Sequence, residues 1–142
     1  MKMNLKQITG TLVLGAGLAL ISGCSSIKGG TTTAGAPVYV AGDLKGNLDA
    51  PIAECDASFN QAINDLHFYK VSEKNDVATI KIQARDQKDR MVTVHLRKLT
   101  DEATSVSIRV GTLGDKPVSQ ELFGHFNKIL AERRAEHPAA KM

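Results

Sequence analysis

Hydrophobic and polar residues alternate with a period of two along several segments after residue 36, which is the pattern of half-buried strands. The first segment runs from Pro37 to Leu48 and predicts a single strand. Its predicted inner face carries Val38, Val40, Gly42, Leu44 and Leu48, and its outer face carries Tyr39, Asp43, Lys45 and Asn47. A second strand is predicted from His67 to Ser72, where Phe68 and the Tyr69/Val71 pair compete for the inner face.

Three more alternating segments follow, separated by short polar turns. Their predicted inner faces carry Ala78, Ile80, Ile82 and Ala84, then Val92, Val94 and Leu96, then Val106, Ile108 and Val110. Their predicted outer faces carry Thr79, Lys81, Gln83 and Arg85, then Thr93, His95 and Arg97, then Ser105, Ser107 and Arg109. Each strand has one apolar side, so one side of the sheet needs a cover.

Two segments instead repeat their apolar residues every three or four positions, which predicts amphipathic helices. The first helix starts at Asp49-Ala50-Pro51, and its apolar stripe is Ile52, Cys55, Phe59, Ala62, Ile63 and Leu66. The second follows the glycine-rich segment 111–115, and its stripe is Val118, Leu122, Phe123, Phe126, Ile129 and Leu130. His137-Pro138 is expected to end it.

These elements predict the α+β fold class, with two layers. An antiparallel sheet of about five strands carries both helices on one face, in the order β-α-β-β-β-β-α. The roughly 100 residues of the segment 37–135 suffice for one domain with one core. Residues 136–142 are expected to form a disordered tail.

Residues 1–23 have the pattern of an export signal. Lys2 and Lys6 give a basic start, and an apolar run from Ile8 to Ile21 leads into Ile21-Ser22-Gly23-Cys24. These last four residues resemble the lipobox of bacterial lipoproteins, where an acylated cysteine follows an aliphatic residue and two small ones. The resemblance implies cleavage between Gly23 and Cys24 and a mature chain held in a membrane by acyl chains on Cys24. It also implies the outer membrane rather than the inner one, because Ser25 replaces the aspartate that commonly retains lipoproteins at the inner membrane.

Two other interpretations of this segment are a retained transmembrane helix and a signal peptide cleaved in the ordinary way, which would leave Cys24 as a plain thiol. The apolar run spans about 21 Å as a helix, against roughly 30 Å of hydrocarbon. The cysteine directly after Gly23 favours the lipoprotein interpretation. Residues 25–36 have no hydrophobic period and predict a flexible tether with a reach of about 20 Å.

The chain has two cysteines, and acylation of Cys24 would leave Cys55 without an intramolecular partner. An unpaired Cys55 could form an intermolecular bridge or act as a reactive thiol, but its place in the helix stripe predicts a buried apolar residue. The net charge of the chain is +3. Without Lys2 and Lys6, 16 basic residues face 15 acidic ones, so the mature chain is nearly neutral and no nucleic-acid partner is expected.

The segment Gly111-Thr112-Leu113-Gly114-Asp115 lies between a strand and a helix, where backbone amides could cradle an anion. Two residues rather than four separate its glycines, so it is not a P-loop. A plain turn in which Asp115 caps the helix is the alternative. His67, His95, His125 and His137 lack metal-ligand spacing, and no catalytic pattern is visible, so we expect no enzyme, metal or cofactor.

One group of side chains suggests binding. Lys81, Arg85, His95, Arg97 and Arg109 share the predicted outer sheet face, which could hold an anionic partner. The other interpretation is a solvated face whose cations are neutralised by acidic side chains from loops.

The segment Ser107-Ile108-Arg109-Val110-Gly111, followed by Gly114-Asp115 and Ser119, resembles small Gram-negative lipoproteins grouped as domain-of-unknown-function family 3568. The similarity extends to the lipobox, the first strand and the helix after Pro51. It implies location and fold but no activity. We therefore expect an envelope lipoprotein that is a non-catalytic interaction or structural module, with an envelope protein or anionic surface as a possible partner. The alternative is a binder of a small anionic ligand or lipid, through the basic face or the loop Gly111, Gly114 and Asp115.

Overall fold

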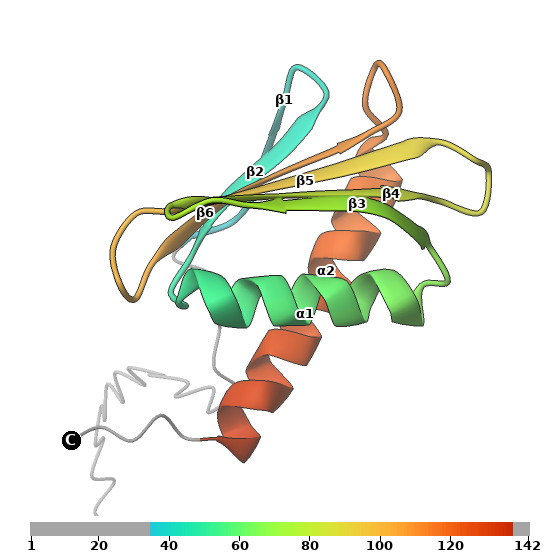
Figure 1. Cartoon of the computed structure of the whole chain (residues 1–142). Coiled ribbons are helices and arrows are strands. Elements are labelled where there is room, and N and C mark those ends of the chain that lie inside the picture. The colour runs from blue at the N-terminus through green and yellow to red at the C-terminus, as the bar shows by residue number, and fades with distance from the viewer. Residues whose placement is uncertain (1–34, 138–142) are drawn as a thin grey trace, which may run out of the picture.

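The computed structural model describes residues 35–137, which form one antiparallel sheet with two helices on one of its faces (Figure 1). The strands are β1 Val38–Val40, β2 Asp43–Leu48, β3 Tyr69–Asn75, β4 Thr79–Arg85, β5 Met91–Lys98 and β6 Thr104–Val110. The helices are α1 Ile52–Asp65 and α2 Lys116–Glu136. The order across the sheet is β1-β2-β6-β5-β4-β3, so β2 and β6 pair although α1 and three strands separate them in sequence. The α+β, two-layer prediction is confirmed.

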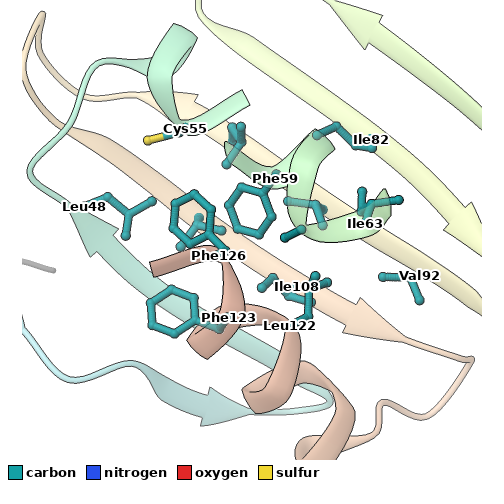
Figure 2. Packing of buried hydrophobic residues seen from close by; sticks show 14 of the residues in the cluster. Leu48, Cys55, Phe59, Ile63, Ile82, Val92, Ile108, Leu122, Phe123 and Phe126 are labelled. Atoms are coloured by element: carbon teal, nitrogen blue, oxygen red, sulfur yellow. The ribbon is translucent and has the colours of Figure 1, made fainter. Parts of the chain in front are cut away.

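The core lies between the sheet and the helices, where the inner residues of β4, β5 and β6 meet the stripes of α1 and α2. Phe59 of α1 and Phe126 of α2 stack with ring centroids 3.8 Å apart and planes 9° from parallel (Figure 2). Ile82, Val92 and Ile108 are fully buried beneath them. The predicted inner faces of these three strands are thus correct, except that Ala78 lies in a turn before β4 and is exposed.

The prediction of one strand from Pro37 to Leu48 is wrong, which makes six strands rather than five. The chain turns back at Ala41 and Gly42, both with positive φ (51° and 88°), as a two-residue hairpin requires. Tyr39 pairs with Leu44 across this hairpin and packs against the core. Val38 and Val40, predicted to face inward, are therefore on the outer face and 59% and 51% exposed.

The facing of the second predicted strand is resolved in favour of Phe68. It packs against the core just before β3, whereas Tyr69 and Val71 are exposed. The pairing of β3 with β4 shifts register between Lys70 and Ser72, which marks a bulge at Val71. β3 is an edge strand, and such a bulge interrupts the regular ladder that a further strand could join.

Cys55 is a free, fully buried residue on the inner side of α1, as predicted. Its Sγ lies 3.8 Å from the carbonyl oxygen of Ala50, which also accepts a 2.8 Å hydrogen bond from Thr104 Oγ1. Burial raises the pKa of the Cys55 thiol to about 11, because a thiolate would lose its hydration in this apolar site.

Candidate anion-binding face

The predicted basic face exists as the outer surface of the sheet, on the side away from both helices. Strand pairing sets its rows. Lys81 of β4 lies opposite His95 of β5, which lies opposite Ser107 of β6, and Ser107 lies opposite Lys45 of β2. With neighbouring strands about 4.8 Å apart, this row crosses roughly 15 Å of the sheet. Arg97 and Ser105 pair in the adjacent row.

Two of the four lysine and arginine side chains predicted on this face are engaged by carboxylates. Arg109 Nε donates to Asp43 Oδ1 at 2.6 Å, and its Nη2 donates to the carbonyl oxygen of Ala41 at 3.0 Å. Arg109 thus holds the β1–β2 turn. The hydrogen bond from Arg109 holds the pKa of Asp43 below its usual value.

Arg85 is engaged at the other corner of the face. Its Nη1 lies 3.0 Å from Asp89 Oδ1 in the β4–β5 turn and donates to the Asp89 carbonyl oxygen at 3.1 Å. For Arg85 and Arg109, the alternative interpretation of cations neutralised by nearby acidic groups is correct.

Lys81 and Arg97 differ from these two. Within residues 35–137, neither forms an ion pair with a carboxylate. His95 lies opposite Lys81 and two residues before Arg97 on β5. Its partial burial and, to a lesser extent, the charge of Lys81 lower the pKa of the His95 imidazole. A neutral His95 can still donate one hydrogen bond, so this part of the face combines two free cations with polar donors.

A hollow of about 390 Å³ lies along β6 on this face. The floor of this hollow is formed by two short side chains, Ser105 and Ser107, which point outward from β6. Longer side chains project from the neighbouring strands on both sides. Arg97 and His95 of β5 line one side, and Lys45 of β2 lines the other. We call this hollow the β6 groove, and its charged residues are Arg97, Lys45 and, at one end, Asp43.

The predicted loop site is shaped by packing. Gly42 and Gly114 lie so close that a Cβ on Gly114 would be 2.3 Å from the Gly42 carbonyl oxygen, and a Cβ on Gly42 would be 2.6 Å from that of Leu113. Both have positive φ, so both positions require glycine. Gly111 also has positive φ, but a Cβ there would meet open space.

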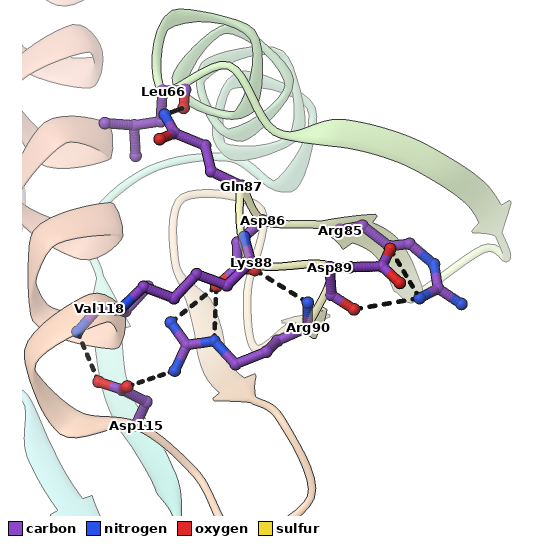
Figure 3. A network of polar contacts seen from close by, with 9 residues as sticks. All are labelled: Leu66, Arg85, Asp86, Gln87, Lys88, Asp89, Arg90, Asp115 and Val118. Carbon is purple, nitrogen blue, oxygen red and sulfur yellow. Dashed lines mark hydrogen bonds and ion pairs between the residues drawn. The ribbon is translucent and has the colours of Figure 1, made fainter.

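Asp115 caps α2, as the second interpretation of this loop predicted. Its Oδ1 accepts from the backbone N–H of Val118 at 3.1 Å, and its Oδ2 accepts from Arg90 Nη1 at 2.5 Å (Figure 3). The hydrogen bond from the Val118 backbone N–H and, to a lesser extent, the one from Arg90 lower the pKa of the Asp115 carboxyl. A carboxylate of the protein itself thus lies at the helix start, where an anion would otherwise bind.

Arg90 extends this network to the β4–β5 turn. Its Nη2 lies 2.7 Å from Asp86 Oδ2, and Asp86 Oδ1 accepts from the backbone N–H groups of Lys88 and Arg90 (Figure 3). Burial raises the pKa of Asp86, but the hydrogen bonds from Arg90 and Lys88 outweigh it, so the pKa lies below its usual value. The network fastens the start of α2 to the sheet.

A hollow of about 530 Å³ lies beside the C-terminal half of α2, and its lining includes three glutamates, Glu54, Glu132 and Glu136, and two arginines, Arg133 and Arg134. Arg134 Nε lies 3.4 Å from Glu54 Oε2, and Arg133 Nη2 donates to Gln61 at 3.0 Å. With more acidic than basic side chains in its lining, this hollow suits an anion less well than the β6 groove does.

Other chemistry is sparse in the part of the chain that the structure describes. Residues 35–137 contain no group of three His, Cys, Asp or Glu side chains placed to hold a metal ion. Neither helix there is long and apolar enough to cross a membrane. His125 lies 3.3 Å from Asp65, so it joins α2 to α1. The predicted cleavage and lipidation residues, Gly23 and Cys24, lie outside the described residues.

Sequence reasoning missed Lys45, Ser105 and Ser107 as parts of the candidate site. Alternation placed all three on outer faces, which was correct. It contained no signal that β2 lies beside β6, and only that pairing brings Lys45 next to the serines.

Comparison with known proteins gives a family but no activity. No curated protein matches the chain. The family model described as "Protein of unknown function (DUF3568)" matches residues 7–129, which is most of the 142 residues. The resemblance found at Ser107–Gly111 is thereby confirmed as a family relationship, and the chain belongs to the DUF3568 family of proteins of unknown function.

Proposed function

We propose that the protein is an envelope lipoprotein whose folded domain is a non-catalytic interaction or structural module. The observation that carries this proposal is the segment Ile21-Ser22-Gly23-Cys24 at the end of an apolar run, followed by twelve linker-like residues before the domain. The mature chain then starts at Cys24, and two or three acyl chains anchor it stably where one would not. Ser25 favours the periplasmic leaflet of the outer membrane.

The non-catalytic part of the proposal rests on the side chains that could do chemistry. Cys55 is buried and its pKa is raised, so it has little thiolate for nucleophilic attack. Asp86 and Asp115 are both held by Arg90. The interior between sheet and helices is filled by apolar side chains, which favours an interaction module over a protein that encloses an apolar ligand.

A second candidate function is the binding of a small anionic ligand or lipid. The free charges of Lys81 and Arg97 beside the β6 groove favour the sheet face for this role. The loop Gly111, Gly114 and Asp115 is less favoured, because the Asp115 carboxylate already accepts the Val118 N–H there.

The anchor is tested in cells by metabolic labelling with a fatty acid. We expect label on the wild-type protein and none on Cys24→Ala, which should accumulate as uncleaved precursor. Cys55→Ala serves as the matched control and should be labelled like wild type. Label on the Cys24→Ala protein would rule out the proposed lipidation site.

A further inference from the structure

We propose that the β6 groove binds a phosphate ester, with Arg97 and Lys45 as its cationic walls and Ser105 and Ser107 as its floor. This deepens the second candidate function, and only the lipid source of the phosphate rests on the proposed anchor.

The groove follows from the sequence of β6 and from its neighbours. Ser105 points outward between Arg97 of β5 and Asn47 of β2. Ser107 points outward in the next row, between His95 and Lys45 of the same two strands. Two short side chains between longer ones leave a furrow along the strand. The furrow ends at the next outward residue of β6, Arg109, whose guanidinium lies against Asp43.

Positive charge exceeds negative charge in the groove, where Arg97 and Lys45 face the single carboxylate of Asp43. Asp43 lines it, but its Oδ1 is engaged by Arg109 at 2.6 Å. Its Oδ2 lies 3.9 Å from Lys45 Nζ, at the outer limit of ion pairing and without hydrogen-bond geometry. Within residues 35–137, Arg97 has no carboxylate partner. Lys81, which lies opposite His95, has no carboxylate partner there either. An anion with more than one charge therefore fits better than a neutral group.

The donors indicate phosphate rather than carboxylate. Guanidinium can bind two phosphate oxygens at once, ammonium acts as a point charge, and each serine hydroxyl can supply one more donor. A carboxylate has two oxygens and a single charge, whereas a phosphate monoester has three terminal oxygens and up to two charges. The set of Arg97, Lys45, Ser105 and Ser107 suits the larger acceptor.

The groove also lies next to the entry of the chain into the domain. A second hollow of about 260 Å³ is lined by Gly35, Ala36 and Val38 together with Lys45 and Ser105. Lys45 and Ser105 are thus shared between the groove and the point where the tether would begin. If the tether is anchored at Cys24, the head groups of the same leaflet are held close to the groove at high effective concentration.

The test uses residues 24–142 with Cys24→Ser, which contains every sheet pairing and core contact described above and cannot be acylated. Glycerol 3-phosphate is titrated into the ¹⁵N-labelled protein, with acetate as the carboxylate control. Vesicles of phosphatidylcholine with about 30% phosphatidic acid, compared with phosphatidylcholine alone, form the lipid arm. We expect saturable shifts of the Ser105 and Ser107 amides with glycerol 3-phosphate and smaller ones with acetate.

Arg97→Gln should weaken this binding by roughly tenfold, because it removes one charge-assisted contact. Lys128→Gln removes an exposed cation from α2, on the opposite layer, and should leave binding unchanged. Vesicle binding that requires phosphatidic acid and Arg97 supports the proposal with a lipid as the source, even if the soluble ester binds weakly. The proposal is overturned if neither probe moves the groove amides, or if Lys128→Gln weakens binding as much as Arg97→Gln. Because Cys24 is absent from this protein, neither result depends on the lipidation site.

Discussion

Burial of Cys55 makes a quantitative prediction about thiol reactivity. In residues 24–142 with Cys24→Ser, Cys55 is the sole thiol. Its side chain is fully buried, and its pKa rises from an ordinary value of 9.0 to about 11. The thiolate is the reactive form, and a rise of about two units in pKa lowers the thiolate fraction about 100-fold at neutral pH. Burial of the sulfur adds to this, so labelling in the native state should be at least about 100-fold slower than in denaturant.

The same shift predicts how stability depends on pH. Below pH 9 both the folded and the unfolded states carry the neutral thiol, so the shift has no effect. Between pH 9 and about 11 the unfolded state loses the proton first, so stability falls as pH rises, by about 2–3 kcal/mol in total. Cys55→Ala should lack this contribution, so the difference between the urea-unfolding series of the two proteins across this pH range isolates it.

The assay is labelling by a chromogenic disulfide reagent at pH 8, followed with and without guanidinium. Cys55→Ser places a hydroxyl in the same site beside the occupied Ala50 carbonyl and should cost about 1–3 kcal/mol. Equal labelling rates in the native and denatured states, or a Cys55→Ser variant as stable as wild type, would refute the placement of Cys55 inside the core.

Three further predictions concern packing and the polar network. Gly114→Ala should lower the free energy of unfolding in urea by about 2 kcal/mol or more, because the new Cβ clashes with the Gly42 backbone and the positive φ adds strain. Gly111→Ala should cost less, because a Cβ there meets open space. Phe126→Ala should lose about 3–5 kcal/mol by calorimetry, since it removes a buried stacked ring. The Asp86 carboxylate contributes stability above its ordinary pKa that is lost as pH falls through its lowered folded value. Asp86→Asn should flatten acid unfolding below about pH 4, where the ordinary carboxyl begins to take up its proton. An unchanged acid profile would contradict the Arg90 network.

The sequence predicted the inner faces well where apolar and polar residues alternate without interruption. Ile80, Ile82, Val92, Val94, Val106 and Ile108 are all buried as expected. Alternation failed from Pro37 to Leu48, because a two-residue turn preserves the appearance of period two while reversing the chain. The turn also uses Ala41 at positive φ, a conformation that alanine rarely adopts and that no residue pattern announced.

The candidate site was predicted only in part, for a different reason. The outward positions of Lys81, Arg85, His95, Arg97 and Arg109 follow from local alternation. Which of them are free depends on contacts distant in sequence, above all Arg109 with Asp43, which are 66 residues apart. Strand order decides such contacts, and a single sequence contains little information on strand order.

The pairing of β2 with β6 has a consequence for the order in which the chain can fold. Short turns connect each strand from β3 to β6 to the next. By contrast, β2 can pair with β6 only after the whole chain between them has been made. Closing a loop of roughly 60 residues costs about 3–4 kcal/mol of chain entropy beyond a constant term. A chain made from its N-terminus therefore presents Leu44 and Leu48 without their β6 neighbours, Ile108 and Thr104, until residue 110 has been synthesised. Truncation anywhere before β6 leaves these two leucines, and the open edge of β2, exposed to whatever other strand is near.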